Sequence, residues 1–391
     1  MTHQNPEVVI VGIGQTPVGE HWHTSLRSSA VQALLAARQD AAGLKPDVIY
    51  ISNVLAATAS HQANLGALIT ENAGLLGVEG LTVEAADASG AAALRLAYTA
   101  ILSGMVDVAM ALGVEKFTDV IGPKAQSFTA QMLDANHEAS EGLTPLSQSA
   151  LLLRRYLYEH DVPREALGAF PVVAHANAIN NPNAMYHKAI KPEAYAHAAL
   201  TADPLNMFDV APYADGAAAV LLTRADKLPD NLLSHPVRIS GASLVVDRLA
   251  LHDREEPLIW SAAALSIQRA CQQAGIQADD VDFFEYADIT TLHAILSLEA
   301  AGFAPRGEGW KMAEEGKLNL NGKLPVATMG GFKGRGHPLG ASGIYQAVEA
   351  VLQLRGQAGA NQIPNAQCGL IQCLAGPAST AVTHVLEGYT Q

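Results

Sequence analysis

Short apolar runs alternate with amphipathic stretches along the first part of the chain. The apolar runs are rich in β-branched residues and predict buried strands at residues 7–14, 47–53, 81–86 and 106–113. The stretches between them place apolar residues at helical spacing. They predict helices after an N-cap at Ser25, over about 61–75, and over 91–102. This alternation of strands and helices predicts an α/β fold with mostly parallel or mixed sheets.

A long stretch of mixed character follows these elements. It contains a helical pattern at 147–160 and a segment rich in Asn and His at 174–183. A connection of this length is longer than an ordinary loop and predicts an inserted, functional region. A strand at 217–222 and a linker with prolines at 228–235 end this part of the chain.

The order of elements then starts again at residue 237. Strands are predicted at 237–246, 282–288, 368–375 and 380–386, and helices at 261–274 and 291–301. Ala88-Ser89-Gly90 opens the central helix of the first half, and Ala341-Ser342-Gly343 opens that of the second. This weak repeat predicts two similar halves, residues 1–230 and 236–391. Their central helices should pack together, so that the reactive loops meet at the helix N-termini.

Residues 330–343, which read GGFKGRGHPLGASG, contain the strongest local signal. Glycine is favoured where the backbone turns tightly or approaches another group closely. His337 therefore lies between glycines at the start of a helix, where a neutral imidazole can direct an N–H toward a developing oxyanion. We interpret His337 as catalytic. The alternative is a histidine that merely caps a loop.

The composition of the chain excludes several classes of function. The chain has 391 residues with 24 basic and 38 acidic side chains, a net charge of −14, and no basic run, so nucleic acid is not expected as a partner. The three cysteines, Cys271, Cys368 and Cys373, cannot form a disulfide framework and lack zinc spacing. No metal site is therefore expected. We predict a cytoplasmic protein without a signal peptide or a membrane-spanning segment.

Several motifs together resemble the thiolase superfamily, in particular its sterol-carrier-protein-type and archaeal acetyl-CoA acetyltransferase branch. They are GHPLGASG at 336–343, VEAADASGAAAL at 83–94, GVEK at 113–116, DPLNMFDVAPYADGAAAVLL at 203–222 and CLAGPAS at 373–379. The resemblance covers essentially the whole chain. It implies two halves in a five-layered α-β-α-β-α arrangement, with a loop domain at about 117–206 that covers coenzyme A. It also implies a homodimer or homotetramer.

The same resemblance implies the chemistry. His337 would stabilise an oxyanion and Cys373 would move a proton at the α-carbon of a coenzyme A thioester, which is a substrate rather than a bound cofactor. Further contacts to the substrate or coenzyme A are expected from the residues Gly336, Gly340, Ser342, His175 and Gly376. Two positions depart from the family pattern: Asp87 stands where relatives have the nucleophilic cysteine, and Ala287, beside Asp288, stands where they have a histidine.

The carboxylate of Asp87 changes the expected mechanism. Attack by Asp87 on a thioester would give a mixed anhydride, which lies uphill, and a fixed negative charge would repel the oxyanion of acyl transfer. Cysteine-dependent thiolysis is therefore expected to be absent or very slow. Asp87 would instead serve as the base for a β-hydroxyl group in aldol or retro-aldol chemistry; decarboxylation of a malonyl-type thioester is a further possibility. The alternative is that Asp87 is only a helix N-cap.

Two functions follow from these residues. The first is a thiolase-like enzyme that acts at the α- and β-carbons of an acyl-CoA. The second is a non-catalytic subunit that scaffolds or regulates a complex with an OB-fold, zinc-ribbon partner. His337, Cys373 and the glycine stretch favour the first function, and Asp87 and Ala287 favour the second. Among the remaining candidates, a lone histidine such as His175 is more often a surface residue.

Overall fold

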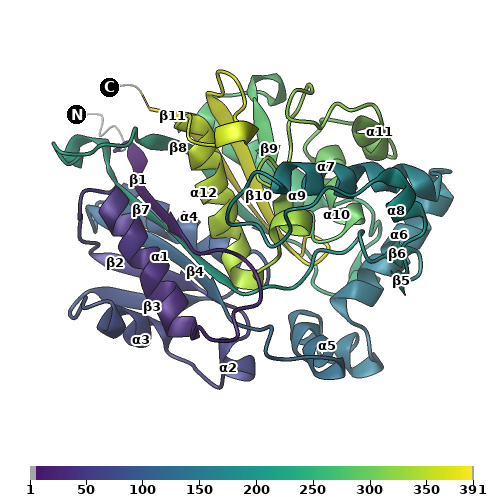
Figure 1. Cartoon of the computed structure of the whole chain (residues 1–391), viewed down its shortest axis with the longest axis horizontal. Helices are drawn as coiled ribbons and strands as arrows, with labels where there is room; N and C mark the ends of the chain where they lie inside the picture. The colour runs from purple at the N-terminus through teal and green to yellow at the C-terminus, as the bar shows by residue number, and fades with distance from the viewer. Residues whose placement is uncertain (1–5, 390–391) are drawn as a thin grey trace.

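Hydrogen bonds join the strands of both halves into one mixed sheet of nine strands in the computed structural model, which describes residues 6–389 (Figure 1). From one edge to the other the strands are β3 (Glu79–Val83), β2 (Val48–Ser52), β4 (Val108–Glu115), β7 (Gly216–Arg224), β1 (Val8–Gln15), β8 (Val237–Val246), β11 (Thr380–Gly388), β10 (Cys368–Ala375) and β9 (Phe283–Glu285). The two halves meet where β1 pairs briefly with β8.

The strand order confirms the predicted duplication. Counted outward from the middle, β1, β7, β4 and β2 on one side correspond to β8, β11, β10 and β9 on the other. The directions agree as well, because β2–β4 and β9–β10 are parallel whereas β4–β7 and β10–β11 are antiparallel. The position that corresponds to β3 is reduced to one bridge between Phe284 and Val326. Each half is thus a version of the same α/β unit.

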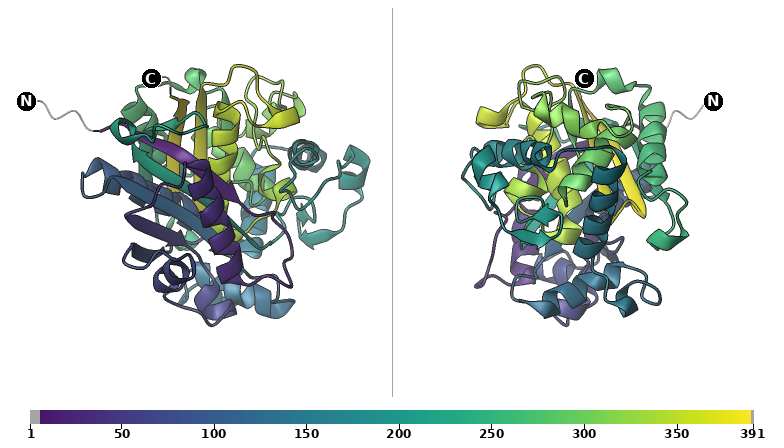
Figure 2. Two further views of the ribbon diagram at one scale, coloured as in Figure 1. Left: turned by 60° about the vertical axis from the view of Figure 1, so that its left-hand side comes forward. Right: turned by 90° about the vertical axis from the view of Figure 1, so that its right-hand side faces the viewer.

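Helices complete the predicted five layers. The helices α1 (Leu26–Asp40) and α3 (Leu65–Asn72) share a buried core with one face of the first-half strands. On the other side of the molecule, α9 (Ser261–Ala274) and α10 (Thr291–Ala300) share a core with β10 and β11. Between the two sets of strands lie α4 (Ser89–Leu102) and α12 (Ser342–Leu354), in a cluster with strands of both halves. Figure 2 shows this layering from two sides.

The first turns of α4 and α12 touch through glycine. A Cβ atom on Gly343 would lie 2.4 Å from the nitrogen of Ala91, and one on Gly90 would lie 2.9 Å from the carbonyl oxygen of Gly340. Any side chain at these positions would force the two helices apart. The Ser-Gly dipeptide that is repeated in the two halves therefore lets the helix N-termini approach, and the loops before them meet as predicted.

Two local predictions were wrong. The helix expected over 61–75 is shortened to α3, because His61 and Asn64 adopt left-handed φ angles of 52° and 54° that a helix does not accommodate. A separate short helix, α2 (Ala56–Ala59), precedes it. No helix was predicted over the Asn-rich segment at 174–183, yet its first five residues belong to α7 (Ala169–Ala178).

The inserted region between β4 and β7 follows a winding path on one side of the molecule (Figure 1). Besides α7 it contains α5 (Pro123–Thr129), α6 (Pro145–Glu159), α8 (Pro192–Ala196), β5 (Leu200–Ala202) and β6 (Leu205–Asn206). A further short helix, α11 (Gly309–Glu314), lies in the second half. Among the helices of residues 6–389, none combines the length and apolar character needed to cross a membrane.

Candidate active site

The turn before α4 directs Asp87 into the interior. Ala86 adopts a left-handed φ of 48°, which is uncommon for a residue with a Cβ atom. The Ser89 hydroxyl stabilises this turn, since it accepts the N–H of Ala85 at 2.8 Å and donates to the carbonyl of Ala86 at 2.6 Å. The result is a buried carboxylate on Asp87, 3% exposed, at the junction of the two halves.

Asp87 is not the N-cap of α4. The cap position is Ala88, and no side chain accepts a hydrogen bond from the first turn. The Oδ1 atom of Asp87 instead lies 3.0 Å from Nε2 of His337, which is 250 residues away in the chain. The interpretation of Asp87 as only a helix cap is therefore wrong.

His337 is fixed on both ring nitrogens. An ionised carboxylate can only accept hydrogen bonds, so Nε2 carries the proton that points at Asp87. Nδ1 lies 2.8 Å from the hydroxyl of Ser342 and, in the neutral ring, accepts its proton. The main-chain N–H of His337 donates to Pro212 at 2.9 Å. These contacts set the tautomer and the orientation of a fully buried imidazole.

Two aromatic rings flank this imidazole. The Phe332 ring stacks on it with a centroid distance of 4.8 Å, and the Tyr213 ring lies at 6.2 Å. Burial and the charge of Asp87 raise the pKa of Tyr213 to about 12, so its hydroxyl stays protonated at neutral pH. The rings restrict the motion of the imidazole and place a phenol close to Asp87.

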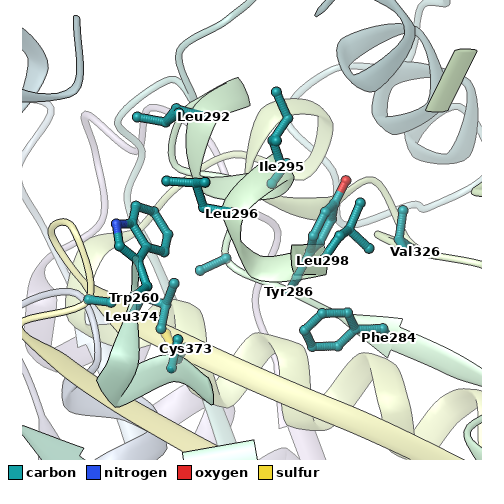
Figure 3. Packing of buried hydrophobic residues seen from close by; sticks show 14 of the residues in the cluster. Trp260, Phe284, Tyr286, Leu292, Ile295, Leu296, Leu298, Val326, Cys373 and Leu374 are labelled. Carbon is teal, nitrogen blue, oxygen red and sulfur yellow. The ribbon is translucent and has the colours of Figure 1, made fainter. Parts of the chain in front are cut away.

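Cys373 completes the group from the second half. It lies on β10 beside Trp260 and Leu374 (Figure 3), and its Sγ atom donates to the main-chain carbonyl of Asp87 at 3.2 Å. Burial and then the negative charge of Asp87 raise the pKa of the Cys373 thiol well above its ordinary value. The group is therefore a thiol that can give a proton rather than a free thiolate.

The predicted glycine and serine contacts lie around these three residues. Gly336 has a φ of 105° and lets the chain turn into His337. The N–H of Gly340 donates to the carboxylate of Glu115 at 3.2 Å, and Ser342 faces His337. The carbonyl of Gly376, in the turn after β10, lies 3.1 Å from Nε2 of His293. Their contacts with substrate or coenzyme A remain predictions.

His175 lies elsewhere; the alternative interpretation of it as a surface residue is wrong, and its contact with substrate or coenzyme A stays a prediction. It is on α7 and only 7% exposed. Its imidazole stacks on Tyr186 at 5.5 Å with the edge of Phe208 at 6.0 Å. Burial lowers the pKa of His175. Its ring forms no hydrogen bond to Asp87, His337 or Cys373 in the part of the chain that the structure describes.

Asp288 anchors the glycine stretch. Its carboxylate accepts the main-chain N–H of Phe332 at 2.6 Å and that of Lys333 at 3.4 Å. Ala287, beside it, is fully buried. The carboxylate therefore holds the π-helical turn Gly331–Arg335 that precedes His337. Within residues 6–389 no three His, Cys, Asp or Glu side chains gather as a metal site would require.

A further buried histidine near the site was missed from the sequence. His293, on α10, donates through Nε2 to the carbonyl of Gly376, so Nδ1 of the neutral ring accepts from the Thr290 hydroxyl at 2.8 Å. The Trp260 ring lies against it at 5.0 Å. Periodicity placed His293 on a buried helical face, but nothing local indicated that this face adjoins Asp87 and His337.

His293 should make the protein sensitive to acid. Burial lowers the pKa of His293 to about 4 from 6.5. Between pH 6.5 and pH 4 the imidazole is therefore protonated in the unfolded chain but neutral in the folded protein. The free energy of unfolding should therefore fall as the pH decreases from 6.5 to 4, by up to about 3 kcal/mol from this group. Urea unfolding at pH 7 and pH 4 measures the fall.

A His293→Gln variant keeps a donor for Gly376 but has no proton to bind. It should lose less stability than the wild type over the same pH interval. Equal losses in the two proteins would contradict the assignment to His293.

Comparison with known proteins gives a consistent family pattern. A family model described as "Thiolase, N-terminal domain" matches residues 8–226, and one described as "Thiolase C-terminal domain-like" matches 243–388. An acetyl-CoA acetyltransferase from Methanothermobacter thermautotrophicus is 38% identical, over 97% of this chain and 99% of its own length. Sterol carrier protein 2 from Bos taurus is 27% identical, over 83% of this chain and 62% of its own.

The fold recurs in solved structures. One of them, described as "Ltp2-ChsH2(DUF35) aldolase", superposes with a TM-score of 0.83 at 24% identity and covers 99% of both chains. At this identity the likeness demonstrates a common fold.

Proposed function

The chain belongs to the thiolase family, and from that premise we propose that it cleaves or forms the bond between the α- and β-carbons of a coenzyme A thioester by aldol chemistry. The observation that carries this proposal is the contact of Asp87 with His337 at 3.0 Å, with the Cys373 thiol 3.2 Å from the carbonyl of Asp87. These three groups can move a proton from a β-hydroxyl oxygen to an α-carbon. None of them has to form an acyl-enzyme.

In the cleavage direction, the Asp87 carboxylate takes the proton of the β-hydroxyl group. The Cα–Cβ bond then breaks, and the β-carbon leaves as part of a carbonyl compound. The electron pair of the broken bond remains on the thioester, which becomes an enolate. The N–H of His337 stabilises the enolate oxygen once the protonated Asp87 no longer holds it. Cys373 protonates the α-carbon. Return of the proton from Asp87 to the Cys373 thiolate restores the starting state.

The charges and pKa values at the site favour aldol cleavage over thiolysis. A thiol whose pKa is raised can deliver a proton to a carbanion, whereas acyl transfer needs a nucleophile that this arrangement lacks. At Asp87 a carboxylate would repel a tetrahedral oxyanion, but it does not oppose removal of a hydroxyl proton. The aldolase description of the structural neighbour applies to that protein.

A direct assay tests the proposal. The protein would be incubated with β-hydroxyacyl-CoA thioesters of several chain lengths without free coenzyme A. The shortened thioester would be measured by chromatography, and the released aldehyde or ketone with a carbonyl reagent. We expect both products in equal amounts. Binding of the thioesters without cleavage of any of them would overturn the proposal.

The second candidate is a non-catalytic subunit that needs an OB-fold partner. Ala287 favours it, because the histidine that relatives use at the oxyanion is missing. The description of the structural neighbour names a DUF35 component as part of that complex. The same assay separates the candidates: a catalytic chain releases both products, whereas a scaffold binds the thioesters and releases neither.

A further inference from the structure

Glu115 is a buried carboxylate that the proposed reaction does not use. It ends β4, is 1% exposed, and has no Lys, Arg or His nitrogen within 4.0 Å in the part of the chain that the structure describes. Its Oε1 atom accepts the side-chain amide of Asn53 at 2.9 Å and the main-chain N–H of Leu55 at 3.1 Å. Its Oε2 atom accepts the main-chain N–H groups of Val54 at 3.0 Å and Gly340 at 3.2 Å. Buried charges are normally paired with an opposite charge, whereas N–H groups alone hold this carboxylate.

The fourth donor comes from the other half of the molecule. Gly340 lies in the turn 338–341, which directly follows His337. Leu339, just before Gly340, has a left-handed φ of 33°, which is uncommon for a residue with a Cβ atom. A backbone conformation of this kind persists only where its surroundings hold it. The bond from the Gly340 N–H to Glu115 is one of the contacts that hold it.

The turn 338–341 also lies directly on the backbone of the first half. A Cβ atom on Gly340 would lie 3.0 Å from the Cα atom of Asn53, and one on Gly113 would lie 2.6 Å from the Cα atom of Ala341. No side chain separates the two backbones there. The position of the turn therefore follows that of the first-half residues around Glu115.

Both contacts of the His337 ring depend on this turn. His337 precedes the turn, and Ser342, whose hydroxyl lies 2.8 Å from Nδ1, follows it. On the other side of the ring, Nε2 meets Asp87 of the first half at 3.0 Å. Glu115 belongs to the first half as well, and through Gly340 it fixes where the imidazole stands relative to Asp87.

The carboxylate must be ionised to hold all four donors, because a protonated carboxyl group turns one of its oxygens into a donor. Burial raises the pKa of Glu115 to about 7, while its N–H donors act in the opposite direction. The ionised form therefore predominates only above this pH. The charged groups nearby have partners of their own: Lys116 binds Asp119 and Asp215, and His337 binds Asp87.

We propose that the ionised Glu115 is a positioning residue, which holds the turn 338–341 so that the His337 imidazole meets Asp87 in the geometry that the reaction needs. This inference rests on the proposed function for the reaction, and it adds a residue that acts through Gly340 rather than on the substrate. Glu115 forms no hydrogen bond to Asp87, His337 or Cys373 within residues 6–389.

The Nε2–H group of His337 reports this geometry without any substrate. In protein labelled with nitrogen-15 histidine, it should give a downfield proton signal at pH 8, because it is buried and donates to a carboxylate. The signal is assigned by its absence in His337→Gln. In Glu115→Gln the new amide presents N–H donors where the carboxylate only accepted, so the His337 signal should shift. The Nε2–H signal of His293, which donates to Gly376, should stay in place.

The same variant should slow cleavage of the β-hydroxyacyl-CoA that the wild type cleaves fastest. A displacement of roughly 1 Å at a catalytic group costs about 100-fold in rate. We therefore expect kcat of Glu115→Gln to fall by about 100-fold with little change in KM. The wild-type kcat should also fall as the pH decreases through 7, where Glu115 takes up a proton. Glu115→Gln has no proton to bind there and should lack this fall.

Glu138→Gln is the matched control. Glu138 is another buried carboxylate, 4% exposed, and it accepts N–H groups of Asp134, Gln148 and Leu251. None of these residues belongs to the turn 338–341. The variant introduces the same chemical change and should keep both the His337 signal and kcat.

The outcomes separate this inference from the proposed function. An unchanged His337 signal or an unchanged kcat in Glu115→Gln overturns the inference and leaves the proposed function standing. If the wild type cleaves no thioester, the proposed function and the role of Glu115 in the reaction are both overturned. Should Glu115→Gln fail to fold, Glu115→Asp replaces it: this variant keeps the charge but withdraws it from Gly340, and it should shift the His337 signal and lower kcat in the same way.

Discussion

Replacement of Asp87 by cysteine should convert the protein into a thiolase with measurable turnover of acetoacetyl-CoA and free coenzyme A. The variant places a thiol just before α4. The Asp87 carboxylate at this position lies 3.0 Å from Nε2 of His337, so the thiol should lie close to the same imidazole nitrogen. That imidazole can take the thiol proton, and removal of the carboxylate abolishes the repulsion of the oxyanion. We expect a rate at least about 1,000-fold above that of the wild type, measured from the loss of enolate absorbance.

Asp87→Ser provides the matched control, because its side chain is similar in size to cysteine but gives no thiolate at neutral pH. It should remain as slow as the wild type. If both variants fold correctly and neither turns over acetoacetyl-CoA, His337 and Cys373 do not support acyl transfer. Rapid thiolysis by the wild type itself would refute the role assigned to the carboxylate.

Removal of the Cys373 thiol should suppress exchange of the α-protons of acetyl-CoA with solvent deuterium. This exchange reports the enolisation step alone and needs no acyl-enzyme. Cys373 is the group proposed to carry the proton, so Cys373→Ala should slow the exchange by about 1,000-fold. Mass spectrometry of acetyl-CoA recovered from deuterium oxide measures the rate.

Cys368→Ala is the corresponding control. Cys368 lies on the same strand and is buried, but it forms no hydrogen bond to Asp87. Its variant should exchange at nearly the wild-type rate, and it also controls for the loss of a buried sulfur atom. Equal exchange in the two variants would show that another group moves the proton.

The sequence predicted elements that local chemistry determines. The apolar run of β10 begins and ends in the structure where it was predicted, and Ser25 caps α1 by accepting the N–H of Ser28. The meeting of α4 and α12 was also predictable, because the same Ser-Gly dipeptide opens both helices. In each case a few consecutive residues contain the information.

The predictions failed where contacts with residues far away in the chain determine the local structure or the role of a side chain. The Asn side chains near α7 gave the impression of a loop, yet Asn177 donates to Val326 and Ala327, about 150 residues away. Position 87 was identified from its motif, but its contact with His337 joins the two halves. His293 and Tyr213 were missed for the same reason: each becomes notable only through its contact with groups from other parts of the chain.

The packing of α4 against α12 also constrains how the chain is made. A ribosome releases the strands and α4 of the first half long before residues 342–354 exist. Until then Ala93, Leu94, Ala97 and Ile101, which are buried in the finished molecule, have no second-half helix to cover them. Nascent or truncated chains that end before α12 should therefore be prone to aggregate, and to depend on chaperones that shield apolar surface.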